Sequence, residues 1–543
     1  RGGRPVSIGE NPEATATPGR RQLARSGAVV ATGTALSRVT GFLRIAALAA
    51  IGFSRLTDVY NVANSTPNIV YELLLGGILT ASLVPLFVDN HQRDDDHATD
   101  AINTVSMVGL LIISALGVLL APLIARIYTS QLSGNVAQQQ QLMTDLLRMF
   151  MPQIFFYGVT ALFTAMLNAR RRFAAAAFAP ALNNLVVIAV LLALPRLHPG
   201  RETVGSVLGD RGGELLLGLG TTLGVVVMTV VLWPALRRTG VRLRWVWDLR
   251  HPAVRRLVRL SGWTVGYAVA NQVAFWIVLV LSYRTAGDTS AYLAAFTFFQ
   301  LPHGLFTVSV ITVIGPELAR AAIARDEAAF RRRYASGLRI VALVALPAGV
   351  LMSVLAEPIV RGALDHGGFR EASVTTTAGT LAWFGIGLIG FSAYLYTVRA
   401  MYAHLDTRTP FLVNLLENAV NVGLAIALYP SMGVRGLALA WTGAYAVAAV
   451  VAWFVLDARV GGLEGPRTLG ALLRIGAATG LAALVAHAID RAIAPTGAWS
   501  SIVTVVVAGG VGMAVAIGGA AVLRVHEIAD LRTTLSRTPR ADA

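Results

Sequence analysis

The stretch SGAVVATGTALSRVTGFLRIAALAAIGF, residues 26–53, indicates the class of fold more directly than any other part of the chain. It is apolar over more than the roughly 20 residues that a helix needs to cross the hydrocarbon core of a bilayer. Two arginines, Arg38 and Arg44, nevertheless stand in its middle. A charged side chain at that depth costs about 2.5–3.5 kcal/mol on insertion scales, so it normally faces a bundle interior or a wet cavity. The stretch therefore predicts a membrane-spanning helix with a functional polar face.

The same pattern repeats along the 543 residues, of which 55% are hydrophobic and 14% charged, with a mean hydropathy of +0.63. Soluble domains are about 45–50% apolar and about 25% charged. We therefore predict an all-α integral membrane protein of about fourteen transmembrane helices. The second, eighth and tenth segments contain Gly, Pro or polar residues, so we expect tilts or kinks there. The fourteen segments lie near residues 26–53, 58–88, 102–128, 143–168, 173–195, 215–236, 257–283, 290–319, 334–357, 375–402, 409–430, 433–456, 468–489 and 499–523.

The basic residues give the orientation of the chain. All 45 are arginine, the formal net charge is +16, and the arginine clusters fall in both termini and in the even-numbered connections. Because positive charge gathers on the cytoplasmic side, we expect a multi-pass protein of the cytoplasmic membrane with both termini in the cytoplasm. On this reading residues 1–25 are a disordered basic arm, residues 237–256 a basic cytoplasmic linker, and residues 525–543 a cytoplasmic tail.

Several classes of function are disfavoured by missing motifs. The sequence has no cysteine, no GxxxxGK[ST] loop and no HExxH-like spacing of its nine histidines. We therefore expect no disulfide, no assigned metal site, no cofactor and no ATP hydrolysis by this chain. The arginines lie between apolar spans rather than along one soluble face, so we also expect no nucleic-acid partner.

Polar residues inside the first two segments suggest a binding site. Ser37, Gly41 and Arg44 share one helix face, whereas Arg38 lies about 120° away around an ideal helix. The second segment carries a polar stripe at i, i+3, i+4 spacing, which we interpret as a cavity wall, with interhelical hydrogen bonding as the alternative. The stripe and the carboxylate that precedes it comprise Asp58, Asn61, Asn64, Asn68, Tyr71 and Glu72.

The segment 409–430 carries a second polar set, with Asn414, Glu417, Asn418 and Asn421 on one side of the helix. One carboxylate with three amides would suit a small cation such as Na⁺ through oxygen ligands, or a proton relay. Ordinary helix packing explains the same pattern equally well. We take Asn414, Glu417 and Asn418 as a possible ion site and expect coupling to Na⁺, H⁺ or the membrane potential.

Four stretches, in order along the chain, carry a family pattern: Ser37–Arg44; Thr57-Asp58 with Pro67-Asn68 and residues 77–85; Leu167–Arg170 with Arg172-Phe173 and Phe178–Asn184; and Arg399–Ala403 with Asp406–Pro410. They resemble the MurJ/MviN family of lipid II flippases, which belongs to the multidrug/oligosaccharidyl-lipid/polysaccharide exporter superfamily. The resemblance covers roughly residues 26–525. Within the family the chain is similar to actinobacterial members, some of which continue into a kinase-like domain. Since this chain begins at Arg1 without Met and ends at Ala543, we expect a fragment or a short form.

The resemblance implies two six-helix lobes around a central cavity, at residues 26–236 and 257–457, and a lipid-tail groove formed by helices 13 and 14 at residues 468–524. It implies a flippase rather than an enzyme, which moves lipid II (undecaprenyl-pyrophosphate bearing a disaccharide-pentapeptide) from the inner to the outer leaflet by alternating access, for cell-wall synthesis. Arg38 and Arg44 match the family's cavity arginines, and Asp58 matches its second-helix aspartate. With the polar residues above, the predicted substrate site is Ser37, Arg38, Arg44, Asp58, Asn68 and Glu72.

The chain departs from the family pattern at three positions. Ile45 stands where the family often has an acidic residue, and Tyr71 and Thr297 stand where it often has cavity arginines. The predicted cavity is therefore less cationic than the family's.

Three alternatives remain open. One is a cation-coupled exporter of drugs or other polyprenyl-linked glycans from the same superfamily, and another is a membrane-embedded glycosyltransferase or polymerase. The third is a scaffold for cell-wall synthesis or division proteins, which is compatible with transport. Besides lipid II, the expected partners are membrane lipids and, on the third alternative, cell-wall synthesis or division proteins.

Overall fold

The computed structural model describes residues 20–73, 79–93, 95–132, 136–200, 203–241, 243–252, 262–525 and 527. Most of the predicted basic arm and tail, the end of the predicted linker and part of the 77–85 stretch lie outside these residues. Every regular element in the described ranges is a helix. The predicted all-α class is therefore confirmed.

The first lobe contains the helices that precede residue 240. They surround one hydrophobic core, in which Leu146, Phe150 and Leu162 are fully buried. The predicted segment 143–168 consists of two helices, α5 and α6, which meet at Met151-Pro152. The helices of this lobe are α1 (Arg20–Ile51), α2 (Arg55–Tyr71), α3 (Leu79–Gln92), α4 (Asp96–Thr129), α5 (Val136–Phe150), α6 (Gln153–Ala169), α7 (Ala174–Leu197), the short α8 (Val204–Leu208) and α9 (Arg211–Arg237).

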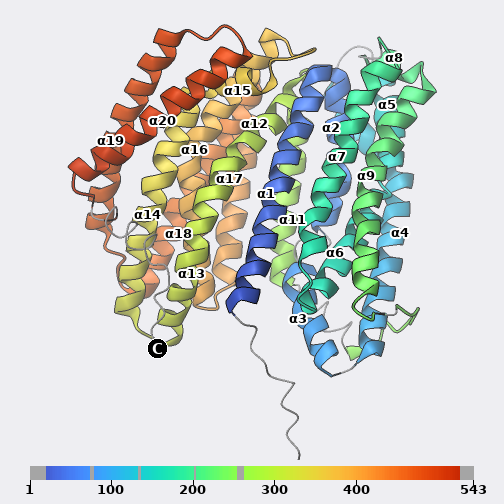
Figure 1. The fold of residues 1–543 in the computed structure, drawn as a ribbon, viewed down its shortest axis with the longest axis horizontal. Coiled ribbons are helices and arrows are strands. Elements are labelled where there is room, and N and C mark those ends of the chain that lie inside the picture. The colour runs from blue at the N-terminus through green and yellow to red at the C-terminus, as the bar shows by residue number, and fades with distance from the viewer. Residues whose placement is uncertain are drawn as a thin grey trace, which may run out of the picture.

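The second lobe has its own core, which is rich in aromatic rings such as Phe299, Phe384 and Trp441. Figure 1 shows the two lobes side by side, with α1 between them at the front. The helices are α11 (Gly262–Ser282), α12 (Asp288–Pro302), the π-helix η2 (His303–Thr307), α13 (Val308–Ile323), α14 (Glu327–Val354), α15 (Ala356–Leu364), α16 (Glu371–Ala403), α17 (Arg408–Met432) and α18 (Val434–Val460).

The last two helices, α19 (Gly465–Ile493) and α20 (Ala498–Val522), pack on α14 and α15 at the outer edge of the second lobe (Figure 1). Their buried faces carry small residues at four-residue spacing, including Ala478, Ala482 and Ala486, which lets helix backbones approach closely. Their outer faces expose leucine and valine, as expected for contact with lipid. The proposed lipid-tail groove on this pair stays a prediction.

The number of spans is lower by strict criteria than the sequence suggested. Each of the fourteen predicted segments coincides with a helix or a helix pair. Within the residues that the structure describes, eleven helices are long and apolar enough to cross a membrane, or twelve if the bent pair formed by α12 and α13 counts as one span. Helices α2 and α3 and the described apolar part of α11 are shorter. The chain is therefore a multi-pass membrane protein, but the count of fourteen is not confirmed.

The predicted kink in the segment 290–319 is confirmed, since the chain bends by 44° where η2 joins α12 to α13. The segment 375–402 is instead one continuous helix, α16. In the segment 58–88, the junction between α2 and α3 includes residues outside the described part of the chain.

The two lobes meet at the end of the bundle opposite the start of α1. There the Gly368 N–H donates to the Ala50 carbonyl at 2.8 Å, and the ring centroids of Phe53 and Phe369 lie 4.9 Å apart. Gly52 allows this approach because its φ is +97° and a Cβ there would lie 2.6 Å from the Gly368 carbonyl oxygen. The hydrogen bonds between the lobes in the described part of the chain gather at this end, which we call the closed end.

Candidate functional site

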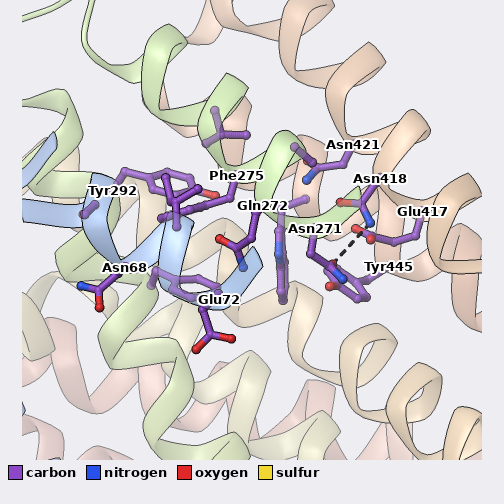
Figure 2. A pocket seen from close by; sticks show the side chains of 16 residues that line it. Asn68, Glu72, Asn271, Gln272, Phe275, Tyr292, Glu417, Asn418, Asn421 and Tyr445 are labelled. Carbon is purple, nitrogen blue, oxygen red and sulfur yellow. Dashed lines mark hydrogen bonds between the residues drawn. The ribbon is translucent and has the colours of Figure 1, made fainter. Parts of the chain in front are cut away.

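A cavity of about 420 Å³ lies between the lobes. This volume is within the range of small-molecule sites, about 300–1,000 Å³. Figure 2 shows amides, two carboxylates and aromatic rings around it. The wall from the first lobe belongs to α2, and the wall from the second lobe belongs to α11, α12, α17 and α18. The lining residues are Ser65, Asn68, Ile69, Glu72, Asn271, Gln272, Ala274, Phe275, Val278, Tyr292, Phe296, Glu417, Asn418, Asn421, Trp441 and Tyr445.

The polar stripe on α2 serves two purposes along its length. Near the closed end, Asn61 is buried and donates to the Ser290 hydroxyl of α12 at 3.0 Å. Further along, Asn68 and Glu72 line the cavity. The interhelical and the cavity-wall interpretations are therefore both correct, each for a different part of the stripe. The described residues include no ion-pair partner for Glu72, so a pairing with Arg38 or Arg44 is not seen.

The wall from the second lobe contains a closed set of amide hydrogen bonds. Asn271 and Asn414 exchange two hydrogen bonds, each 3.2 Å long. Asn418 donates to the Asn271 oxygen at 3.3 Å (Figure 2). Glu417 lies on α17 with Asn414 and Asn418, is 1% exposed, and lines the cavity. Its Oε2 atom has no hydrogen-bond partner among the described residues. The amides thus satisfy one another and leave the carboxylate for another partner.

Asp58 connects the lobes at the closed end. Helix α12 begins after Gly287, whose φ is +89° and which has no side chain to cap the helix. Asp58 of α2 supplies the cap instead, because its carboxylate accepts from the Gly287 N–H at 2.5 Å and the Ser290 N–H at 2.9 Å. A carboxylate at a helix N-terminus is also favoured by the helix dipole. Asp58 therefore joins the two lobes by hydrogen bonds in this structure and is not among the described residues that line the cavity.

Arg55 strengthens the same junction from one turn earlier in α2. Its guanidinium lies 4.8 Å from the centre of the Tyr283 ring and donates to the carbonyls of Tyr283 and Arg284. These carbonyls follow the C-terminal end of α11, where positive charge is favourable. The predicted site did not include Arg55.

Arg44 faces the first lobe. It lies close enough to Tyr60 and Tyr157 to act electrostatically on both phenol groups. Tyr157 in turn reaches Asn68 with its hydroxyl, and its ring centroid lies 5.4 Å from that of Tyr71. Arg44 is therefore separated from the described cavity lining by one aromatic residue.

Arg38 faces the second lobe instead. Its guanidinium lies over Gly304 in η2, so closely that a Cβ on this glycine would be 2.6 Å from the Arg38 Cζ atom. The neighbouring His303 has an Nδ1 atom with no partner among the described residues, and its ring lies 4.6 Å from the Phe391 ring. A π-helical turn inside a span often marks a functional position. The wide angle predicted between the two arginines thus directs them to different lobes.

The remaining predicted positions have local partners. The Ser37 carbonyl accepts from the Asn184 amide of α7 at 3.2 Å, which fixes α1 to the first lobe. Thr297 donates to the Leu293 carbonyl of its own helix at 3.0 Å. Neither residue is among the described residues that line the cavity.

The described residues contain no group of three or more His, Asp or Glu side chains that could hold a metal ion. The residues that sequence reasoning missed are mainly the aromatic ones, Tyr292, Phe296, Trp441 and Tyr445. No signal could have identified them, because an aromatic residue in an apolar span resembles any other core residue. Asn271 and Gln272 were visible as polar residues inside a span, but they gave no indication of which neighbour they contact.

Comparisons with known proteins agree on one family. The family model described as "Lipid II flippase MurJ" matches residues 47–508. A "Probable lipid II flippase MurJ" of Rhizobium meliloti (strain 1021) is 28% identical over 442 residues, which cover 79% of this chain and 81% of that protein. A protein of the same description from Vibrio cholerae serotype O1 is 28% identical over 484 residues, which cover 83% and 89%.

Solved structures show the same fold. The structure described as "Lipid II flippase MurJ, inward closed conformation" superposes with a TM-score of 0.73 at 21% identity, over 93% of this chain and 99% of that one. An inward-facing multidrug resistance transporter of the MATE family superposes with a TM-score of 0.62 at 15% identity, over 78% and 96%.

Proposed function

We propose that this chain, which belongs to the MurJ family of lipid II flippases, flips lipid II by alternating access of the cavity between its lobes. The head group would enter from the inner leaflet and leave at the outer leaflet for cell-wall synthesis. The chain is thus a transporter, and we propose that it carries out no covalent chemistry.

The observation that carries this proposal is the position of the cavity relative to the closed end. Asp58 and Arg55 fasten the lobes at one end, whereas the cavity lies beyond this junction, between the same two lobes. Release of a few polar contacts there would give the cavity a second opening without unfolding either core. The described conformation then corresponds to access from the side on which α1 begins, which we propose is the cytoplasm.

We propose that Arg38 and Arg44 receive the diphosphate. A guanidinium binds phosphate oxygens in bidentate fashion and stays charged when desolvated. The two arginines lie on one helix between the lobes, one facing each lobe. A diphosphate that contacts both would therefore sense the relative position of the lobes. Ser37 holds α1 in place for this role, while Asn68 and Glu72 contact the sugar portion of the head group.

We also propose that the cycle couples to Na⁺, H⁺ or the membrane potential at the set Asn414, Glu417 and Asn418. The support is the buried Glu417 carboxylate, whose Oε2 atom has no hydrogen-bond partner among the described residues while the amides satisfy one another. Flipping in proteoliposomes should respond to at least one imposed gradient, and Glu417→Gln should remove that response. If a sodium gradient, a pH gradient and a potassium diffusion potential each left the flipping rate the same as without any gradient, coupling would be contradicted.

We further propose that the protein lies in the cytoplasmic membrane with both termini in the cytoplasm. We also propose that it contacts cell-wall synthesis or division proteins. The support for the orientation is the arginine distribution. Reporter fusions at each terminus would test it.

The experiment that tests the function is native mass spectrometry of the purified protein with lipid II, undecaprenyl phosphate and a neutral glycolipid. We expect selective binding of lipid II by the wild type and its loss in the double variant Arg38→Ala/Arg44→Ala. Equal binding of all three lipids would leave a transporter of the same fold with another substrate, as in the exporter alternative.

A further inference from the structure

The cavity wall formed by the second lobe takes no part in the proposed binding of the diphosphate. Glu417 lies in this wall, almost completely buried, and no basic side chain in the described part of the chain forms an ion pair with it. A buried carboxylate without a partner is unfavourable by several kcal/mol. Such a group is neutralised either by a proton or by a positively charged ligand.

The neighbouring amides do not neutralise this carboxylate. Asn271, Asn414 and Asn418 bond to one another, as described above. Asn421 lines the same cavity, and its Oδ1 atom likewise accepts no hydrogen bond from any residue in the described part of the chain. The wall therefore contains two buried acceptors without N–H or O–H donors, one of them in a carboxylate. A primary ammonium group has three donors and a positive charge.

Aromatic rings surround the same wall and distinguish between kinds of cation. The Trp441 and Tyr445 rings lie 4.5 Å apart, and the Phe296 ring lies 6.0 Å from that of Trp441. Tyr292 and Tyr445 are both near enough to Glu417 to sense its charge. Ring faces attract organic cations. Ring faces do not coordinate a metal ion, which would depend instead on the oxygen atoms of Asn414, Glu417 and Asn418.

We propose that Glu417, with Asn421 and the rings of Trp441 and Tyr445, binds an organic ammonium group, and that this group is the free amine of the head group's peptide. The proposal rests on lipid II as substrate and assigns the two ends of the head group to different walls. The diphosphate lies toward the arginines of α1, and the ammonium lies against the second lobe. In the loaded state the ammonium occupies the place that a coupling ion would take in the empty state.

This arrangement makes the second lobe a selector for charge on the peptide. A head group whose amine is blocked would place a neutral group beside the unpaired carboxylate. The penalty for leaving that carboxylate buried and unpaired would then oppose binding. The diphosphate contacts would be unchanged, so blocking the amine should weaken binding without abolishing it.

The test compares two forms of lipid II that differ only at the amine. One carries lysine at the third peptide position, and the other is the same lipid acetylated on the lysine ε-amine. We expect the wild type to bind the free-amine form at least about tenfold more tightly in native mass spectrometry. Glu417→Gln should bind the free-amine form more weakly than the wild type does. Its affinities for the two forms should therefore be equal. Glu417→Asp, which keeps the charge, should retain part of the difference.

The matched control is Glu317→Gln, the same chemical change at a half-exposed position on α13 outside the cavity. It should keep the full difference between the two lipids. Equal binding of both lipids by the wild type would overturn the proposal while leaving lipid II as the substrate. Failure of the wild type to bind either lipid would instead contradict the proposed function.

A second arm identifies the source of the ammonium. A free cation, lysine amide, is added to the wild type in the absence of lipid II, and its transport into proteoliposomes is measured. We expect no transport. Glu417-dependent transport of lysine amide without discrimination between the two lipids would overturn the assignment to the peptide amine.

Discussion

Asp58 of the first lobe accepts two hydrogen bonds from Ser290 of the second, one from its backbone N–H at 2.9 Å and one from its hydroxyl at 2.7 Å. One carboxylate thereby caps a helix that belongs to the other half of the protein.

Replacing Asp58 with alanine should open the closed end. The change leaves the Gly287 and Ser290 donors without their acceptor, and each hydrogen bond to a charged group is worth about 1.5–3 kcal/mol. The chain has no cysteine, so Ser65→Cys in the cavity lining gives a single labelling site. Labelling by a membrane-impermeant maleimide from the closed side should rise several-fold in Asp58→Ala. Asp145→Ala, which removes an intrahelical pair in α5, should leave it unchanged.

Placing a methyl group on Gly304 should displace the Arg38 guanidinium. The added Cβ would lie 2.6 Å from three guanidinium atoms, which sit at the end of a flexible side chain and can move away at little cost to stability. Gly304→Ala should therefore flip lipid II as poorly as Arg38→Ala, and the double variant should be no worse than either. Gly315→Ala, where nothing lies within 4 Å, is the control. Additive losses in the double variant would show that Gly304 acts independently of Arg38.

Removing the Arg44 side chain should abolish transport but not insertion. We expect Arg44→Ala to fail in cell-wall complementation while it still reaches the membrane, and Arg44→Lys to recover only part of the activity because lysine cannot bind phosphate in bidentate fashion. Tyr157→Phe should lower lipid II affinity by about tenfold or less, since it removes one neutral hydroxyl between Arg44 and Asn68. Normal growth of Arg44→Ala would contradict the assigned role.

The stability contributed by Asp406 should depend on pH. Burial alone would raise the pKa of this carboxyl, but hydrogen bonds from Thr409 and the nearby Arg459 outweigh burial and lower it. A lowered pKa means that the contribution is fully present above about pH 4, the ordinary value, and is lost as the pH falls through the lowered one. Asp406→Asn should thus lower the Tm in detergent at pH 7, and the difference from wild type should shrink below pH 4. A constant difference down to pH 3 would contradict this.

Much of the fold could be read from local composition. The helices α14, α16, α17, α18, α19 and α20 each coincide with a predicted apolar segment to within a few residues, apart from polar extensions such as the start of α14. The bend at η2 was also expected, from Pro302 and its polar neighbours. Short or interrupted helices such as α2 and α3 were predicted as one span, because hydropathy averages over a break.

The candidate site could be read only in part. Asn68, Glu72 and Glu417 were selected as polar residues inside spans, and all three line the cavity. Asp58 was selected for the substrate site, and the structure places it in the junction between lobes. The same i, i+4 spacing gives a cavity wall at Asn68 and an interlobe hydrogen bond at Asn61, so spacing alone does not separate the two.

The sequence by itself determined that this protein is a bundle of membrane-crossing helices with polar faces turned inward. It did so because the cost of placing charge or backbone in lipid depends on each segment's own composition. Only the tertiary structure decided which lobe each polar face meets. Arg38 and Arg44 lie six residues apart on α1 but contact opposite lobes, and Glu417 gains its aromatic neighbours from α12 and α18. Such pairings depend on how helices distant in sequence pack together, and no local pattern records that.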